Sequence, residues 1–241
     1  MTTRVQPRPS PRRCSGFLTP RRVAGLVVAL TGLCLFAGCA TIPALRRAGV
    51  SSGYRPDNIF TLARVLPKDL RRVAVLPVSS STQSADLADG REAVEPVLVA
   101  ELIKTKRFEV IPISPQTLRA RTGRDRWTAA EPLPVEFFAA LRDACGCDAI
   151  LFAELTEYRA YAPVAVGWRL KLVDARTGMA LWAGDELFDA RKAEVVAAAK
   201  HYQAGENRSA GVTHGEWAVL HSPRRFAQYS VAQLFDTLPL R

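Results

Sequence analysis

The stretch GWRLKLVDARTGMALWAGDELFDA, residues 167–190 of this 241-residue chain, decides the fold. Large apolar residues alternate here with basic ones, in the order Trp168, Arg169, Leu170, Lys171 and Leu172. This period of two predicts a strand with one apolar and one polar face. Gly178 supplies a turn, because a positive φ costs least in glycine, and residues 179–190 return as the partner strand, with Leu181 closing over the apolar face. We therefore expect a β-hairpin with its apolar face against a core and its two basic side chains pointing away.

Apolar runs and helical spacing predict the elements around this hairpin. Short apolar runs predict buried strands at 73–78, 108–113 and 149–158. Helices are expected where apolar residues recur every three or four positions. One such helix lies around Val94–Leu102, with Pro96 near its start. The others are expected at 115–121, 134–146, 191–203 and from 223 onward. Polar segments predict loops at 79–90, 122–133 and 205–215. We expect one α/β (or α+β) domain at 71–241, three-layer-like, with helices packed on a mixed central sheet that ends in the hairpin.

The first 70 residues have a different character. Arg21 and Arg22 precede an uncharged apolar run at 23–37, which as a helix would be ~22 Å long. A bilayer core is ~30 Å thick, so the run is short for a membrane span and suits a signal peptide. A buried helix and an uncleaved anchor are the alternatives. Residues 39–70 lack periodicity and carry Gly, Ser and Pro, so we expect a tether, with residues 62–70 as an alternative start of the globular part.

The leader ends in LFAGC at 35–39, which resembles the lipobox of bacterial lipoproteins, with Phe36 where Leu is usual. The resemblance implies cleavage between Gly38 and Cys39, removal of residues 1–38, and lipid on Cys39. Ala40 stands where an Asp would retain a lipoprotein at the inner membrane, so the resemblance implies the outer membrane and a domain that faces the periplasm. Arg12-Arg13 leaves the twin-arginine export route open beside the Sec route, although Phe17-Leu18 lies one or two residues too far along.

Most of the formal charge of +10 belongs to this leader. Residues 1–38 hold six arginines and no acidic residue, so cleavage would leave +4. The basic balance therefore indicates a targeting segment, and we expect no nucleic-acid partner.

Two of the five cysteines, Cys145 and Cys147, belong to the expected domain. One intervening residue would strain a disulfide between them. A metal site would need more ligands, and the histidines at 201, 214 and 221 lie on later segments. We expect two small buried side chains at a helix-to-strand junction, with no metal and no cofactor.

The order of these segments is similar to that of a superfamily of bacterial envelope proteins. The superfamily contains the curli-secretion lipoprotein CsgG, the lipoprotein activators of peptidoglycan synthases and the amino-terminal domain of TolB. The matching segments are RRVAVLPV at 71–78, GCDAI at 146–150 and LVDARTGMALW at 172–182. The resemblance covers residues 71–189 and implies a protein without enzymatic chemistry that builds channels or scaffolds and docks onto partners.

The curli channel protein carries membrane-spanning hairpins within this domain. A hairpin of that kind needs ~20 residues, because one transmembrane strand takes ~9–11. Eight residues, RAYAPVAV at 159–166, separate the corresponding strands here, so we do not expect a pore.

The sequence carries none of the signatures GxSxG, HExxH, P-loop or GxGxxG. Acidic residues near strand ends are expected on the solvated surface: Asp148, Glu154, Glu157, Asp174, Asp185, Glu186 and Asp189. The four tryptophans are expected in the core or on the hairpin face. Two basic groups are docking candidates, Arg169 with Lys171 on the hairpin, and Arg121, Arg124 and Arg126 in the segment RARTGRDR at 119–126.

Together these observations predict a lipid-anchored accessory or assembly protein of the cell envelope that is not an enzyme. It would hold the membrane through lipidated Cys39 and dock to envelope machinery for secretion or peptidoglycan synthesis. A homo-oligomer is one form that such assembly would take. The alternatives are an envelope hydrolase that uses Asp and His from the β-rich half and a small-ligand binder that uses the aromatic hairpin face.

Overall fold

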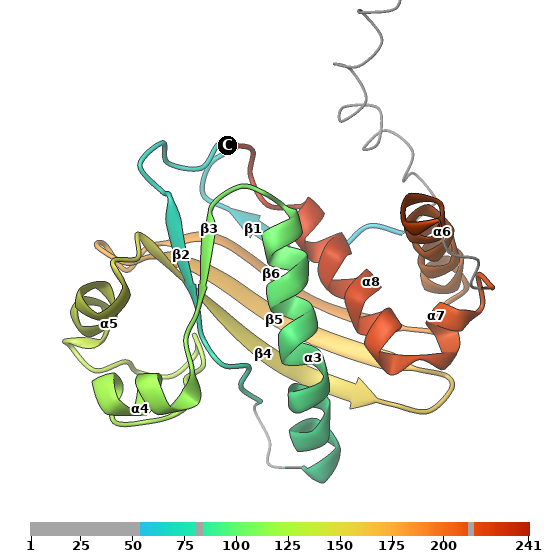
Figure 1. Ribbon diagram of the computed structural model, residues 1–241, viewed down its shortest axis with the longest axis horizontal. Helices are drawn as coiled ribbons and strands as arrows, with labels where there is room; N and C mark the ends of the chain where they lie inside the picture. Colours follow the sequence, from blue (N-terminus) through green and yellow to red (C-terminus); the bar gives the residue numbers. More distant parts are fainter. Residues whose placement is uncertain (1–53, 81–83, 212–214) are drawn as a thin grey trace, which may run out of the picture. The chain divides into compact units, whose positions relative to one another are not determined.

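The computed structural model describes residues 54–80, 84–211 and 215–241. The expected signal peptide, Gly38, Cys39 and the first part of the expected tether lie outside these ranges. Within them one sheet has six strands in the order β1-β6-β5-β4-β2-β3 (Figure 1). The strands are β1 (Ile59–Thr61), β2 (Arg72–Val75), β3 (Glu109–Pro112), β4 (Ala149–Arg159), β5 (Ala165–Asp174) and β6 (Ala180–Asp189). β2 runs parallel to β3 and β4, whereas the β4, β5, β6 and β1 neighbours are antiparallel, so the mixed sheet is confirmed.

Helices cover the two faces of this sheet unequally. One face packs against α3 (Ala85–Lys104), α6 (Ala193–Ala210), α7 (Ala218–His221) and α8 (Pro223–Asp236). The opposite face packs against α4 (Pro115–Thr122) and α5 (Phe137–Cys145), which Figure 1 shows over the β2 side of the sheet. Successive residues of β2 point to opposite faces, so Val73 and Val75 join the first core and Ala74 joins the second. This arrangement gives the expected three layers around β2 and β4.

The hairpin of β5 and β6 forms as its alternation predicts. Gly178 has φ +70° in the turn, and the backbone N–H groups of Arg176 and Thr177 donate to Asp174 Oδ1 at 2.9 and 2.8 Å. Trp168 and Trp182 are fully buried under α8, where their indole N–H groups donate to Ser230 and Thr237 at 2.8 and 3.0 Å. These hydrogen bonds satisfy the polar atoms of two large core side chains. Leu172 is paired with Trp182, and Leu181 is buried beside a register irregularity.

Two helices are longer than their sequence patterns indicate. α3 begins at Ala85, inside the predicted loop, because the Ser84 side chain accepts the N–H of Leu87 at 3.2 Å and caps the helix. Gly90 suggested a loop, but a Cβ there would lie 2.5 Å from the Tyr158 ring, so glycine lets α3 pack close to β4. Pro96 is consequently inside the helix rather than near its start. α6 likewise runs through the predicted loop to Gly211, whose φ of +64° ends it.

Part of the range expected as a tether is folded. β1 pairs with β6, and Tyr54 donates to Glu186 Oε1 at 2.7 Å. Leu66 and Leu70 are each only 4% exposed, and the N–H of Leu66 donates to the Leu240 carbonyl at 2.7 Å. The sequence lacked a periodic signal here because three strand residues and two isolated anchors are too few to produce one.

Among the described residues, no helix is both long and apolar enough to cross a bilayer.

Candidate docking surface

The face of the hairpin that points away from the helices is open on β5, β6 and β1. Arg169 and Lys171 lie on it, as their alternation with the buried residues predicts. Lys171 is paired with Ala183, which is paired with Phe60, so these three residues share the face. Phe60 and Leu187 are 50% and 42% exposed. We call Phe60, Arg169, Lys171, Asp185 and Leu187 the outer hairpin face, and its mixture of apolar and charged side chains is typical of a protein interface.

Arg169 is held by carboxylates on the two flanking strands. Its Nε donates to Asp185 Oδ2 on β6 at 2.8 Å, and its Nη1 lies 3.3 Å from Glu154 Oε2 on β4. The hydrogen bond with Asp185 raises the pKa of Arg169. Glu154 is 4% exposed, so this guanidinium is the partner of a buried carboxylate. The two basic candidates on β5 are therefore not equivalent. Arg169 forms ion pairs with carboxylates of the neighbouring strands, whereas Lys171 is half-buried and has no such ion pair among the described residues.

Two acidic residues expected on the solvated surface are buried instead. Glu154 is one, and Asp189 at the end of β6 is the other. Asp189 accepts hydrogen bonds from Arg191 Nε at 2.8 Å and Arg159 Nη2 at 3.1 Å. Burial alone would raise the pKa of Asp189, but the hydrogen bonds from Arg191 and Arg159 lower it to about 2. The sequence prediction was wrong at these positions because it did not place an arginine against each carboxylate.

The basic segment at 119–126 divides into two parts. Arg119 and Arg121 lie exposed on α4. Arg124 and Arg126 lie in the connection that follows, where Arg124 Nη1 contacts Glu131 at 2.6 Å and its guanidinium stacks 4.3 Å from the Trp127 ring centroid. Arg126 Nε donates to the Val78 carbonyl at 3.0 Å. One run of arginines in the sequence thus gives an exposed pair on a helix and a second pair that is fixed by local contacts.

A cleft of about 560 Å³ lies beside Arg124 and Arg126. Arg91 of α3 also lines it and donates from Nη1 to Ser80 Oγ at 2.7 Å. Arg91 was not predicted as a site residue from the sequence, because the residues next to it match no known motif. The sequence does place Arg91 in the first part of a helix that follows β2. That position points to a site once the order of the strands is known.

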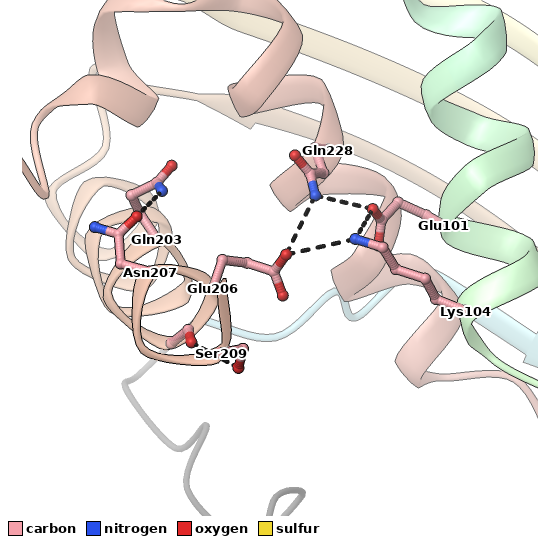
Figure 2. A network of polar contacts seen from close by, with 8 residues as sticks. Glu101, Lys104, Gln203, Glu206, Asn207, Ser209 and Gln228 are labelled. Carbon is pink, nitrogen blue, oxygen red and sulfur yellow. Dashed lines mark hydrogen bonds and ion pairs between the residues drawn. The ribbon is translucent and has the colours of Figure 1, made fainter. Parts of the chain in front are cut away.

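A separate polar network joins α3, α6 and α8 (Figure 2). Glu101 is 6% exposed and accepts from Lys104 Nζ at 2.7 Å and from Gln228 Nε2 at 3.0 Å. The same two donors reach Glu206 Oε2 at 3.4 and 3.5 Å. Burial would lower the pKa of Lys104, but the contact with Glu101 raises it. The network pairs a buried carboxylate with donors from neighbouring helices and therefore fixes helix packing.

Cys145 and Cys147 are free thiols at the junction of α5 and β4, where Cys147 is buried as expected and Cys145 is only partly buried. Cys147 is buried in the second core, and the Cys145 thiol donates to the Leu141 carbonyl at 2.9 Å. Burial, followed by the contact with Cys145, raises the pKa of Cys147 to about 12. A thiol with a raised pKa is a poor nucleophile and a poor metal ligand, so the pair serves packing. The described residues contain no group of three or more His, Cys, Asp or Glu arranged to hold a metal ion.

No family model matches this sequence, and no curated protein matches it. Its fold is similar to several solved structures at low sequence identity. A PelC dodecamer from Paraburkholderia phytofirmans has 16% identity over 78% of this chain and 97% of that one, with a TM-score of 0.40. The lipoprotein GNA1162 from Neisseria meningitidis has 18% identity over 59% and 99%, with a TM-score of 0.36. TolB from Acinetobacter baumannii has 12% identity over 65% and 32%, with a TM-score of 0.28.

These similar structures thus include a bacterial lipoprotein and TolB, two kinds of protein named in the sequence resemblance. At such TM-scores the likenesses carry no functional argument. The function is therefore inferred from this chain's own residues, and the narrower resemblance to CsgG stays a prediction.

Proposed function

We propose that this protein is a lipid-anchored accessory protein of the bacterial cell envelope, without enzymatic activity, which faces the periplasm from the outer membrane. The observation that carries the proposal is the order Arg21-Arg22, an apolar run at 23–37, and Ala37-Gly38-Cys39. That order is typical of a cleaved leader, and lipid on Cys39 would then anchor the mature chain. One acyl chain binds a bilayer only marginally at ~0.8 kcal/mol per buried CH₂, so stable anchoring requires more than one chain.

Lipid anchoring is tested by changing Cys39 and, in parallel, Cys34 of the leader. Cys39→Ser should block lipidation and release the domain from the membrane fraction or leave an unprocessed precursor. Cys34→Ser lies within the apolar run and serves as the matched control, with processing retained. The readouts are precursor size, membrane fractionation and the mass of the amino-terminal peptide. A Cys39→Ser protein that is cleaved at the same site and stays membrane-bound would refute the anchor.

The docking half rests on the outer hairpin face. This face leaves Phe60 and Leu187 about half exposed and also carries Lys171, while the opposite side of the same strands is buried under helices. An exposed apolar group framed by charge is where a partner gains most by covering it. We propose that envelope machinery for secretion or peptidoglycan synthesis, or a second copy of this chain, binds there.

A photo-crosslinking residue at position 171 or 187 tests that proposal in intact cells. Crosslinked species of defined mass should form from both positions, and mass spectrometry identifies the captured chain. The same residue at position 121 is the control, because Arg121 is exposed but lies on α4. Crosslinks from position 121 with none from 171 and 187 would move the docking surface to the basic helix.

A further inference from the structure

The cleft beside Arg91 occupies a position in the sheet where ligands are commonly bound. β2 lies between β3 and β4 and is parallel to both. The chain leaves β2 for α3 on one face of the sheet and leaves β3 for α4 and α5 on the other. In open α/β sheets, such a divergence of connections leaves a crevice outside the carboxyl ends of the strands. The cleft lies there, lined by Ser79 and Ser80 after β2, by α3, and by the 124–131 connection.

Arg91 is the residue that gives this cleft its character. Its guanidinium contacts Ser80 Oγ, and among the described residues no carboxylate lies within ion-pair distance of it. Its Nε is buried and has no hydrogen-bond acceptor in the described structure. Burial, and next the charge of Arg126, lower the pKa of Arg91, although an arginine stays protonated under such a shift. The guanidinium groups of Arg91 and Arg126 therefore line one cleft, and carboxylates balance their positive charge only in part.

The rest of the lining leaves the cleft with a positive balance. Three arginines line it, at 91, 124 and 126, against two carboxylates, Asp125 and Glu131. Glu131 is committed to Arg124 at 2.6 Å, and Asp125 is 3.4 Å from Arg126. The first turn of α3 also borders the cleft through Ser84, Ala85 and Ala88, and the amino end of a helix favours negative charge.

The neighbouring hollow limits where an anion would sit. That hollow, of about 770 Å³, continues along α3 and shares Ala88, Arg91 and Arg126 with the cleft. Asp89, Glu92 and Glu95 line it, so a negative ligand would be repelled on that side. The favourable volume is thus the cleft itself, where Arg91, Arg124 and Arg126 all contribute to the lining.

We infer that this cleft binds the phosphate or carboxylate group of a small anionic ligand, with Arg91 and Arg126 as the contacting groups. Guanidinium presents several N–H donors in a planar fork that matches the oxygens of either anion. Thr128 and Ser79 supply further polar groups on the wall. This assignment does not depend on the lipid anchor, because it rests on residues of the folded domain alone.

Equilibrium dialysis of the full chain in detergent micelles tests the inference directly. Radiolabelled inorganic phosphate, citrate and glycerol phosphate are titrated separately at constant ionic strength set with chloride. The three probes distinguish free phosphate, carboxylate and lipid-headgroup chemistry. We expect saturable binding of at least one probe at one site per chain. A wild-type chain that binds none of the three saturably above chloride would overturn the inference.

Matched arginine variants then place the site. Arg91→Gln and Arg126→Gln should each weaken binding at least tenfold, since each removes a charged donor from the anion. Arg121→Gln removes the same charge from the exposed side of α4 and should leave binding unchanged. Arg91→Lys should bind with intermediate affinity, because it keeps the charge and loses the fork. Equal losses in Arg121→Gln and Arg91→Gln would show bulk charge attraction and refute the site.

Thermal unfolding of each variant keeps the comparison valid. Arg126 also donates to the Val78 carbonyl, so Arg126→Gln is read only if it unfolds as the wild type does. If Arg126→Gln unfolds differently, the inference is decided by comparing Arg91→Gln with Arg91→Lys. Arg91→Gln should lower the affinity for the anion tenfold or more, and Arg91→Lys should lower it less. Unchanged binding in Arg91→Gln would overturn it.

Discussion

The parallel and antiparallel halves of the sheet are built for different surroundings. β2 and β4 are covered on both faces, so neighbouring residues such as Ile150 and Leu151 are both buried but belong to different cores. β5 is covered on one face along most of its length, so Leu170 is buried while Lys171 is only half-buried on the open side. The difference follows from the sequence: continuous apolar runs suit two-sided burial, and strict alternation suits one-sided burial. Among the described strands, an open sheet face is left where alternation occurs.

The largest expected effect comes from truncating core residues on each half. Ile150→Ala and Leu151→Ala should each lower the free energy of unfolding by about 2–5 kcal/mol, because each opens a cavity in its own core. On β5, Leu170→Ala should cost a similar amount and Lys171→Ala about 0.5 kcal/mol or less. Urea unfolding measures all four. A large loss of stability in Lys171→Ala would show that both faces of β5 are covered in solution. The proposed difference between the two halves of the sheet would then be wrong.

Reversing charge on the open face should separate its two basic residues. Arg169→Glu removes the guanidinium that pairs with buried Glu154 and adds a like charge beside it. Because Arg169 is itself about half exposed, we expect a loss of about 1–3 kcal/mol, less than for a fully buried pair. Lys171→Glu should change stability by about 0.5 kcal/mol or less. Equal effects of the two reversals would mean that the Arg169 pairing contributes nothing to folding.

Strain in the hairpin turn should have a smaller effect. Gly178 has φ +70°, so Gly178→Val should destabilise the hairpin by about 1–2 kcal/mol and lower the thermal midpoint. Gly205 lies inside α6, and no atom lies within 4 Å of the place that a Cβ would take there, so Gly205→Ala is the control and should be neutral or stabilising. A silent Gly178→Val would show that the turn adopts another conformation.

A pH dependence is also expected at the end of β6. The folded pKa of Asp189 is lowered to about 2 from an ordinary value near 3.8. Stability from its ion pairs should be fully present above about pH 4 and be lost as pH falls toward 2. Urea midpoints measured from pH 6 to pH 2 should therefore fall less steeply for Asp189→Asn than for the wild type. Parallel curves for the two proteins would rule out the contribution of these pairs.

Most of the fold followed from local patterns, because strand alternation and helical spacing are set by which faces are buried. The hairpin, the positive φ of Gly178 in its turn, and the buried strands β2 and β4 were predicted for this reason. α3 and α6 were mispredicted at their ends, because Gly90 and Gly205 resemble loop residues when the packing around them is unknown. β1 escaped notice because its partner is distant in sequence.

The candidate sites were harder to predict than the fold. Lys171 and Arg169 were placed on the correct face, but the carboxylates that hold Arg169 come from two other strands. Arg91 meets Arg126 only through the order of β3, β2 and β4. Side chains that are brought together by the order of the strands show no regular spacing along the sequence. A cleft of this kind is therefore found only from the three-dimensional structure.

The edge of the sheet also sets an order of events for folding. β1 needs β6 as its partner, and Leu66 needs the Leu240 carbonyl, while Arg107 donates to the carbonyls of Leu238 and Pro239. A chain that crosses a membrane amino end first would therefore leave residues 59–61 unpaired until β6 had followed, and Leu66 unpaired until residue 240 had followed. During that interval the segment nearest the proposed anchor would be open to chaperones and proteases.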